Sequence, residues 1–223
     1  MQLLKEYYFV GGMPEAVATF VGKRDVQKVR AVHQSILETY RDDIPKYTRN
    51  LQGKRVLEVF DYCAAHLGVK VVFSNVSQAH SNKVKEAVGL LAKAGVIYQV
   101  THVSCAGLPL KAGEDPDVFK LYFLDIGLYN ALMALQWIEL DRLAPEELLI
   151  KGKMAEQFVA QHLMFRQGQE ISRSLHYWLR NGKKGAAEAD FVIAQEGKIY
   201  PIEVKAGSSG KMRSLWQLLA ERK

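Results

Sequence analysis

The sequence has 223 residues, 48% of them hydrophobic and 24% charged, which is enough apolar material for one large or two small folded domains. Its formal net charge of +6 favours phosphate-rich partners. No run of about 18 apolar residues is present, so we expect no membrane span and no membrane partner. Without a signal peptide the chain is expected in the cytoplasm, with Cys63 and Cys105 reduced and partly buried rather than paired or bound to zinc.

Residues 1–50 are predicted to be helical. Pro14 suits the first turn of a short helix, because the N-terminus of a helix does not need the N–H that proline lacks. Asp25 is the predicted N-cap of a long amphipathic helix in which apolar residues recur at helical spacing. We interpret this segment as a helical linker.

Residues 51–135 have the element order of a winged helix-turn-helix. The pattern predicts a helix, a small helix and a third helix that stops at Gly95, where a left-handed residue can close it. A strand is expected over 96–103, followed by a loop that forms the tip of the wing. The sequence therefore predicts a winged-helix-like domain over 51–135.

The exposed face of the third helix is the candidate nucleic-acid contact, through Asn82, Lys83 and Lys85. Residues 51–100 contain six lysine or arginine residues and three acidic ones, an excess of positive charge that suits phosphate binding. Winged helices also dock proteins. DNA contact and protein docking both remain open for this unit at the level of sequence.

Further helices are predicted toward the end of the chain, among them short ones in 136–148 and a last one in KMRSLWQLLAERK. In FKLYFLDIGLYNALMAL a strand leads into a helix, and Asp125 at the junction is expected to cap that helix rather than bind a metal. A later helix is predicted from about residue 149. Its expected buried stripe is Met154, Ala155, Phe158, Val159, His162 and Leu163. Glu156 lies at the margin of this stripe, from where its carboxylate can reach a cleft beside a sheet.

The stretch from Leu175 to Lys205 is predicted to form three strands joined by turns. Alternate side chains of a strand share a face, so Glu203 and Lys205 are expected to point the same way. Asp190 is expected on the neighbouring strand, with twelve residues between it and Glu203. These three charged groups are therefore predicted to share one cleft.

Two carboxylates on adjacent strands predict a site for Mg²⁺ or Mn²⁺, because Mg²⁺ takes one or two carboxylates together with waters and phosphate oxygens. Asp190 and Glu203 are the expected side-chain ligands. The carbonyl of Val204 is a further candidate ligand, and Glu156 is expected to bind the metal or a metal-bound water. Lys205 would orient that water or offset negative charge that grows on a phosphate during cleavage.

The order of a helix Glu, a strand Asp and then Ile-Glu-Val-Lys resembles the core of the PD-(D/E)xK nuclease superfamily, with Glu156, Asp190, Glu203 and Lys205 at the motif positions. This resemblance implies a nuclease-like α/β core over 149–223 and hence an α+β or α/β protein overall. It implies metal-dependent cleavage of phosphodiesters. The superfamily core continues with a further strand, so the core is expected to be truncated at its last strand.

A wider resemblance covers nearly the whole chain. The blocks GGMPEAV, SNKVKEAVGLLAKAGVIYQV, FKLYFLDIGLYNAL, GKMAEQFVAQHL and EADFVIAQEGKIYPIEVKAG are similar to those of prokaryotic AAA-type ATPases with a C-terminal domain of unknown function. This resemblance implies an ATPase domain before Gly11, to which the helical linker would connect. The chain has no G-x-x-x-x-G-K-[ST] motif, so ATP is expected to bind only that other domain.

Three readings follow from the sequence. In the first, the chain is the C-terminal part of an ATPase, with a DNA-binding winged helix and a Mg²⁺-dependent nuclease-like module. In the alternative, a degenerate nuclease fold and the winged helix form a non-catalytic module that binds DNA or protein. In a third, all chemistry resides in the ATPase domain and this region targets or assembles it. An oligomer is compatible with each reading.

Overall fold

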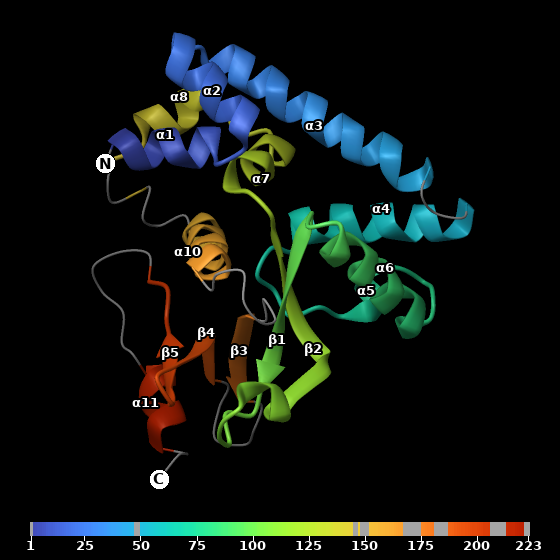
Figure 1. Cartoon of the computed structure of the whole chain (residues 1–223), viewed down its shortest axis with the longest axis vertical. Coiled ribbons are helices and arrows are strands. Elements are labelled where there is room, and N and C mark those ends of the chain that lie inside the picture. The colour runs from blue at the N-terminus through green and yellow to red at the C-terminus, as the bar shows by residue number, and fades with distance from the viewer. Residues whose placement is uncertain are drawn as a thin grey trace.

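The protein has a mixed α/β fold in which helices surround a single mixed sheet (Figure 1). The fold is that of a computed structural model, which describes residues 2–46, 50–144, 147, 152–166, 175–180, 187–205 and 213–220. The first of the turns expected between the last three strands, at 181–186, lies outside the described residues.

Helices from two distant parts of the sequence form one end of the molecule, above the sheet in Figure 1. They are α1 (Gln2–Val10), α2 (Pro14–Lys23), α3 (Val26–Lys46), α7 (Ile126–Leu132) and α8 (Trp137–Arg142). Pro14 begins α2 as predicted. Asp25 caps α3 as predicted, because its Oδ1 accepts hydrogen bonds from the backbone N–H groups of Gln27 and Lys28.

The structure confirms the predicted capping role of Asp125. The same side chain also joins two segments that are distant in sequence. Its Oδ1 accepts a hydrogen bond from the backbone N–H of Leu128 in the first turn of α7, at 3.0 Å. Its Oδ2 accepts a hydrogen bond from the backbone N–H of Gly12, at 2.7 Å. The carboxylate is 2% exposed, so both bonds replace contacts with water that folding removes. One buried side chain thus holds the α1–α2 turn against the start of α7.

The middle of the chain follows the order helix, short helix, helix, strand, strand. The elements are α4 (Asn50–Ala65), α5 (Phe73–Val76), α6 (Ser81–Lys93), β1 (Ile97–Val103), the 3₁₀ turn η1 (Leu110–Gly113) and β2 (Glu114–Phe123). Gly95 follows α6 with φ +72°, as its predicted role requires. The segment after α4 also pairs with β2, since the N–H groups of Gly68 and Val71 donate to the carbonyls of Leu121 and Phe119.

The last part of the chain adds three strands to the same sheet. They are β3 (Leu175–Arg180), β4 (Ala187–Gln195) and β5 (Lys198–Ile202), which agree with the predicted three strands. The sheet order is β2-β1-β3-β4-β5, and all neighbours are antiparallel except β1 and β3, which are parallel. The sheet is therefore continuous across the segment that separates the predicted winged-helix-like and nuclease-like domains.

Two helices cover opposite faces of this sheet. Helix α10 (Gly152–Arg166) packs on β2 and β3, and α11 (Arg213–Ala220) packs on β4. Tyr177 belongs to the large core with α10, whereas its neighbour Trp178 packs in a smaller cluster with Leu218 of α11. Adjacent residues of a strand point to opposite faces, so the two clusters lie on the two sides of the sheet.

The buried face of α10 matches the predicted stripe only in part, since Met154 is buried and Phe158, Val159 and Leu163 are half-buried against the core. Its buried residues are Met154, Gln157, Ala160, Gln161 and Met164, whereas His162 is exposed. Gln157 accepts a hydrogen bond from the N–H of Phe123 and donates one to its carbonyl, at 2.9 and 2.7 Å. Gln161 accepts a hydrogen bond from the N–H of Ile126 at 3.0 Å. The apolar pattern missed the most buried positions because they include two amides that bind the backbone at the end of β2 and the start of α7.

Cys63 and Cys105 are both thiols, as expected from the sequence, and both are buried rather than partly buried. Burial raises the pKa of the Cys63 thiol, so this group is kept protonated. Among the residues that the structure describes, no helix is both long enough and apolar enough to cross a membrane.

Replacing Asp125 with alanine is expected to lower the free energy of unfolding by about 2–3 kcal/mol, because it leaves buried N–H groups without acceptors. Asp25→Ala is the matched control, since this cap is partly exposed. It should cost about 1 kcal/mol or less. Chemical denaturation of both variants measures the difference, and equal losses would show that Asp125 acts only as an ordinary cap.

Candidate carboxylate site

Asp190 lies at an irregularity of strand β4. From Trp178 to His176 strand β3 advances two residues, whereas the paired segment of β4, from Ala189 to Val192, advances three. The extra residue is a β-bulge, a feature that changes the direction of nearby side chains and is frequent beside functional sites. Asp190 is half-buried at this bulge, and its Oδ2 accepts a hydrogen bond from the backbone N–H of Val204 at 2.7 Å.

Glu203 and Lys205 follow strand β5 rather than lying within it, because β5 ends at Ile202. As expected, the two side chains meet, and the ammonium of Lys205 pairs with Oε1 of Glu203. The Glu203 side chain is only 10% exposed. Its Oε2 is buried and has no hydrogen-bond partner in the part of the chain that the structure describes. Within those residues, this oxygen is therefore an acceptor without a donor.

Glu156 approaches the sheet from α10, as its position at the margin of the predicted stripe suggested. Its Oε2 accepts a hydrogen bond from the hydroxyl of Tyr122 at 3.3 Å and lies 3.7 Å from the ammonium of Lys153. Gly68 permits this approach, because a Cβ there would lie 2.5 Å from the same oxygen. The backbone at Gly68 also has φ +64°, which favours glycine.

Lys120 is a member of the site that sequence reasoning missed. It lies on β2, is 2% exposed, and its ammonium pairs with the carboxylate of Glu188 on β4. The ammonium also lies over the ring of Tyr177 on β3, 4.9 Å from the centroid. One signal was available, since Lys120 interrupts the otherwise apolar run VFKLYF. The sequence alone does not identify the strands over which the side chain of Lys120 extends.

The carboxylates of the site affect one another through space. Burial raises the pKa of Glu156, an effect that Lys153 opposes and Asp190 adds to. Burial likewise raises the pKa of Asp190, and the negative charge of Glu203 raises it further. The N–H of Val204 and the positive charge of Lys120 act in the opposite direction. A hydrogen bond to Glu203 raises the pKa of Lys205. The structure thus brings Glu156, Asp190, Glu203 and Lys205 into one electrostatically linked group.

A metal ion at this site would be coordinated by few protein side chains. Among the described residues, no three His, Cys, Asp or Glu side chains are close enough together to hold an ion. Mg²⁺ commonly takes only one or two carboxylates and fills its other positions with waters and phosphate oxygens. The unsatisfied Oε2 of Glu203 and the neighbouring carboxylate of Asp190 fit that requirement. For Val204 the recorded contact is its N–H, not the carbonyl predicted as a ligand.

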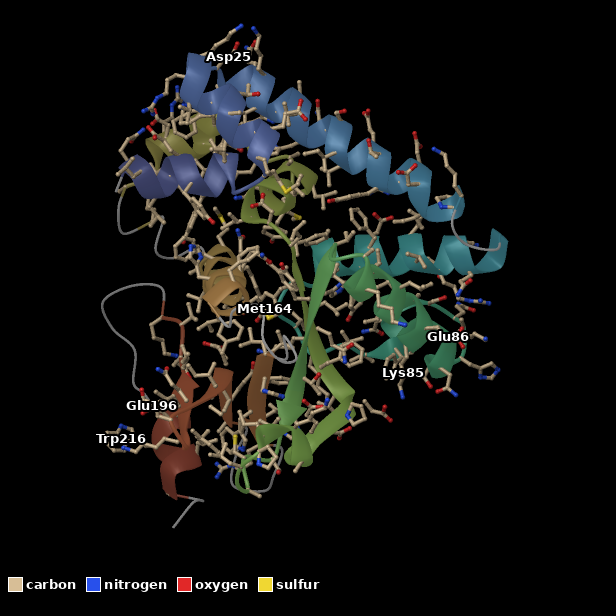
Figure 2. The ribbon with its side chains drawn as sticks, viewed as in Figure 1. Asp25, Lys85, Glu86, Met164, Glu196 and Trp216 are labelled. Carbon is tan, nitrogen blue, oxygen red and sulfur yellow. The ribbon has the colours of Figure 1, made fainter. Side chains whose placement is uncertain are left out.

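The predicted nucleic-acid contacts lie at the start of α6. Asn82 and Lys83 are exposed, and Lys83 pairs with Glu86 at 3.1 Å. Lys85 is half-buried, pairs with Asp117 of β2 and lies over the ring of Phe73. Figure 2 shows Lys85 and Glu86 close together at the outer margin of the molecule. Both lysines are therefore accessible at a surface, but each is already paired with an acid.

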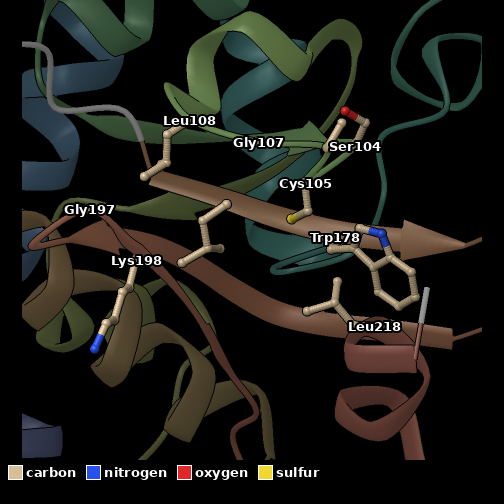
Figure 3. Close-up of a pocket in the computed structure, with 10 residues that line it drawn as sticks. Ser104, Cys105, Gly107, Leu108, Trp178, Gly197, Lys198 and Leu218 are labelled. Atoms are coloured by element: carbon tan, nitrogen blue, oxygen red, sulfur yellow. The ribbon is translucent and has the colours of Figure 1, made fainter. Parts of the chain in front are cut away.

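A pocket of ≈ 840 Å³ lies elsewhere, at the side of the sheet that α11 covers (Figure 3). It is lined by the loop after β1, by the β4–β5 turn, and by Trp178 and Leu218. None of the predicted site residues lines it. Because Trp178 and Tyr177 point to opposite faces, the pocket is separated by the sheet from the face of Lys120.

The comparisons with known proteins divide the chain into two parts. Residues 1–139, more than half of the chain, match the family described as "Domain of unknown function (DUF8612)". The chain belongs to this family. Residues 151–223 match "Domain of unknown function (DUF4143)". No curated protein and no solved structure matches the chain. The carboxylate site spans both matches, since Lys120 and Tyr122 belong to the first and Glu156 and Asp190 to the second.

Replacing Glu156 with glutamine is expected to stabilise the protein above the ordinary pKa range of glutamate. The folded-state pKa of Glu156 is raised, so its ionisation disfavours folding, and that cost grows as pH rises through the raised pKa. Below the pKa that Glu156 has in the unfolded protein, the carboxyl is neutral in both the folded and the unfolded state. The variant should then gain no stability. Denaturation at pH 4 and pH 8 measures this. The exposed Glu86→Gln is the control, and a gain that is equal at both pH values would contradict the prediction.

Proposed function

We propose that the chain is a nucleic-acid-binding module that cleaves phosphodiesters with Mg²⁺ or Mn²⁺ at Asp190 and Glu203. The observation that carries this proposal is the buried Oε2 of Glu203, which has no partner among the described residues and lies near the carboxylate of Asp190. An unpaired buried carboxylate oxygen is costly unless a cation or proton neutralises it. Together with Lys205 at the motif position, this favours a cation site over a surface ion pair.

Each residue has a defined part in the proposed reaction. Asp190 and Glu203 would hold the cation, which when bound would polarise the phosphodiester and activate a water for attack. The N–H of Val204 fixes the orientation of the Asp190 carboxylate. Lys205 moves its ammonium from Glu203 to a phosphate oxygen, where it offsets the charge that develops during cleavage. Tyr122 holds the carboxylate of Glu156 in place through a hydrogen bond. In the proposed reaction this carboxylate accepts a hydrogen bond from the attacking water.

We also propose that residues 51–123 act as a winged helix that brings DNA to the site. The element order supports this: α4, the segment paired with β2, α5, α6, and then the hairpin of β1 and β2. In this proposal α6 contacts the phosphates through Asn82, Lys83 and Lys85. The lysines exchange their acidic partners for phosphates, which limits the net gain in binding.

The proposed setting is a larger protein with an AAA-type ATPase domain. The DUF4143 domain is common in proteins associated with AAA-type ATPases, which supports this setting. ATP binding and hydrolysis would then belong to the ATPase domain, and the present residues would supply DNA binding and cleavage.

The second candidate is a non-catalytic module that binds DNA or protein. The ion pairs of Lys205 with Glu203 and of Lys120 with Glu188 favour it, because they neutralise part of the carboxylate charge without any metal. In this reading the same carboxylates stabilise the sheet, and α6 alone contacts the partner. Metal binding and cleavage assays separate the two candidates.

We expect the protein to bind Mn²⁺, and Asp190→Asn and Glu203→Gln each to weaken binding by about tenfold or more, as even indirect changes at metal sites do. Calorimetry measures the affinity. Glu196→Gln is the matched control, because this carboxylate is exposed in the turn between β4 and β5. If both site variants bind Mn²⁺ like wild type, the carboxylates are not its ligands.

Cleavage of a DNA duplex in Mg²⁺ should be lost in Glu203→Ala and Lys205→Ala, because the first removes a ligand and the second the charge beside the phosphate. A gel assay of purified protein measures this beside Glu196→Gln. Activity that persists in both variants would indicate a contaminating nuclease. Metal binding without cleavage by any form would favour the non-catalytic module.

The double variant Lys83→Ala/Lys85→Ala should weaken DNA binding and reduce the slope of log affinity against log salt by about 2, one for each lost phosphate contact. Fluorescence anisotropy at several salt concentrations measures the slope. Lys28→Ala/Lys46→Ala is the matched control, since these lysines are also paired with acids but lie on α3. Equal slopes for the two double variants would exclude α6 as the contact.

A further inference from the structure

The carboxylate site contains a buried positive charge that the proposed reaction does not use. Lys120 is 2% exposed, and its partner Glu188 on β4 is 39% exposed at its side chain. A lysine is rarely buried unless its charge is compensated, because the loss of hydration is costly. Its ammonium is compensated by the Glu188 carboxylate and by the face of the Tyr177 ring. This lysine is therefore held in the site by groups from β3 and β4.

The position of Lys120 in the sheet shows how it reaches that site. Strands β1 and β3 lie between β2 and β4, and neighbouring strands are about 4.8 Å apart. The side chains of Lys120 and Glu188 must therefore extend toward each other over two intervening strands. Tyr122, two residues along β2 and hence on the same face, meets Glu156 of α10. Strand β2 thus contributes two contacts to carboxylates from the other family domain.

The face of the sheet that carries Lys120 also has a buried polar group without a hydrogen-bond partner among the described residues. The hydroxyl of Tyr177 is buried and has no hydrogen-bond partner in the described residues, although the ammonium of Lys120 lies over its ring. Lys120 therefore pairs with the Glu188 carboxylate and leaves this hydroxyl without a hydrogen bond from its ammonium. Its charge acts on Asp190 and Glu156 as well as on Glu188.

We propose that Lys120 is a positioning residue of the carboxylate site: an internal counter-ion, supplied by the DUF8612 domain, that holds Glu188 and balances Asp190 and Glu156 when no metal is bound. The site is then built by both family domains, and Glu188 of the DUF4143 domain lacks this ion-pair partner without β2. A bound divalent cation competes with this charge. The inference rests on the proposed function only for its metal-binding consequence.

The test replaces Lys120 with methionine, which keeps most of the volume of the side chain and removes its charge. At pH 8 we expect Lys120→Met to bind Mn²⁺ about tenfold more tightly than wild type, because one repelling charge leaves a partly buried site. A purely structural loss would weaken binding instead. Lys5→Met is the matched control, since Lys5 is also buried but donates to the carbonyls of Asp141 and Leu143, far from the site in the sequence and the fold.

A second readout does not depend on metal. The amide of Val204 donates to Asp190, so its ¹H–¹⁵N signal reports the charge around that carboxylate. It should shift in metal-free Lys120→Met and stay in place in Lys5→Met. Should Lys120→Met not fold, Lys120→Met/Glu188→Gln removes both charges of the pair, which is often tolerated where removal of one is not. This double variant should bind Mn²⁺ with an affinity close to that of wild type. Glu188→Gln alone should bind Mn²⁺ more weakly than either.

The outcomes separate the two proposals. If wild type binds no Mn²⁺, the proposed function fails, and the Val204 signal alone then decides the role of Lys120. If wild type binds Mn²⁺ but Lys120→Met matches Lys5→Met in both affinity and Val204 signal, Lys120 is a structural residue and the inference is overturned. For the double variant, an affinity equal to that of Glu188→Gln alone would overturn it as well.

Discussion

The parallel pairing of β1 with β3 is the constraint on which the rest of the structure depends. Val100 pairs with Leu175 and His102 with Tyr177, which joins the two family domains in one sheet. Side chains alternate between faces, so a slip of one residue would move Tyr177 to the other face and away from Lys120. The register of this single strand pair therefore decides whether β2 and the carboxylates of β4 meet. Because parallel strands require a long connection, α10 lies between them in sequence and covers the resulting face.

Polar groups buried at the same junction fix the position of α10. Gln157 binds both backbone groups of Phe123, and Gln161 binds the N–H of Ile126 beside the capping carboxylate of Asp125. Each unsatisfied buried group would cost about 1–3 kcal/mol, so alternative rotations of α10 are disfavoured. This rotation directs Glu156 to Tyr122 and the sheet. The junction between the domains thus also determines the geometry of the site.

The charges of the site are close to balance but not equal. In the described part of the chain, the carboxylates of Glu156, Glu188, Asp190 and Glu203 lie near the ammonium groups of Lys120, Lys153 and Lys205. The pKa values of Glu156 and Asp190 are raised because burial removes water that would stabilise their charge. Such a cluster is stable without a metal yet retains an excess of negative charge. This is the physical basis for proposing that cation binding and internal ion pairs compete there.

The sequence by itself determined the local features of this protein. Helix caps such as Asp25 and Asp125, the stop at Gly95 and the three strands of the last part follow from short-range rules, and each is present in the structure. The sequence also singled out Glu156, Asp190, Glu203 and Lys205 from their order and spacing, and the structure links these four electrostatically.

Only the tertiary structure decided which face of α10 is buried, that one sheet unites both parts, and that Lys120 reaches Glu188 over two strands. These features depend on pairing between residues far apart in sequence, for which periodicity and local propensity contain no information.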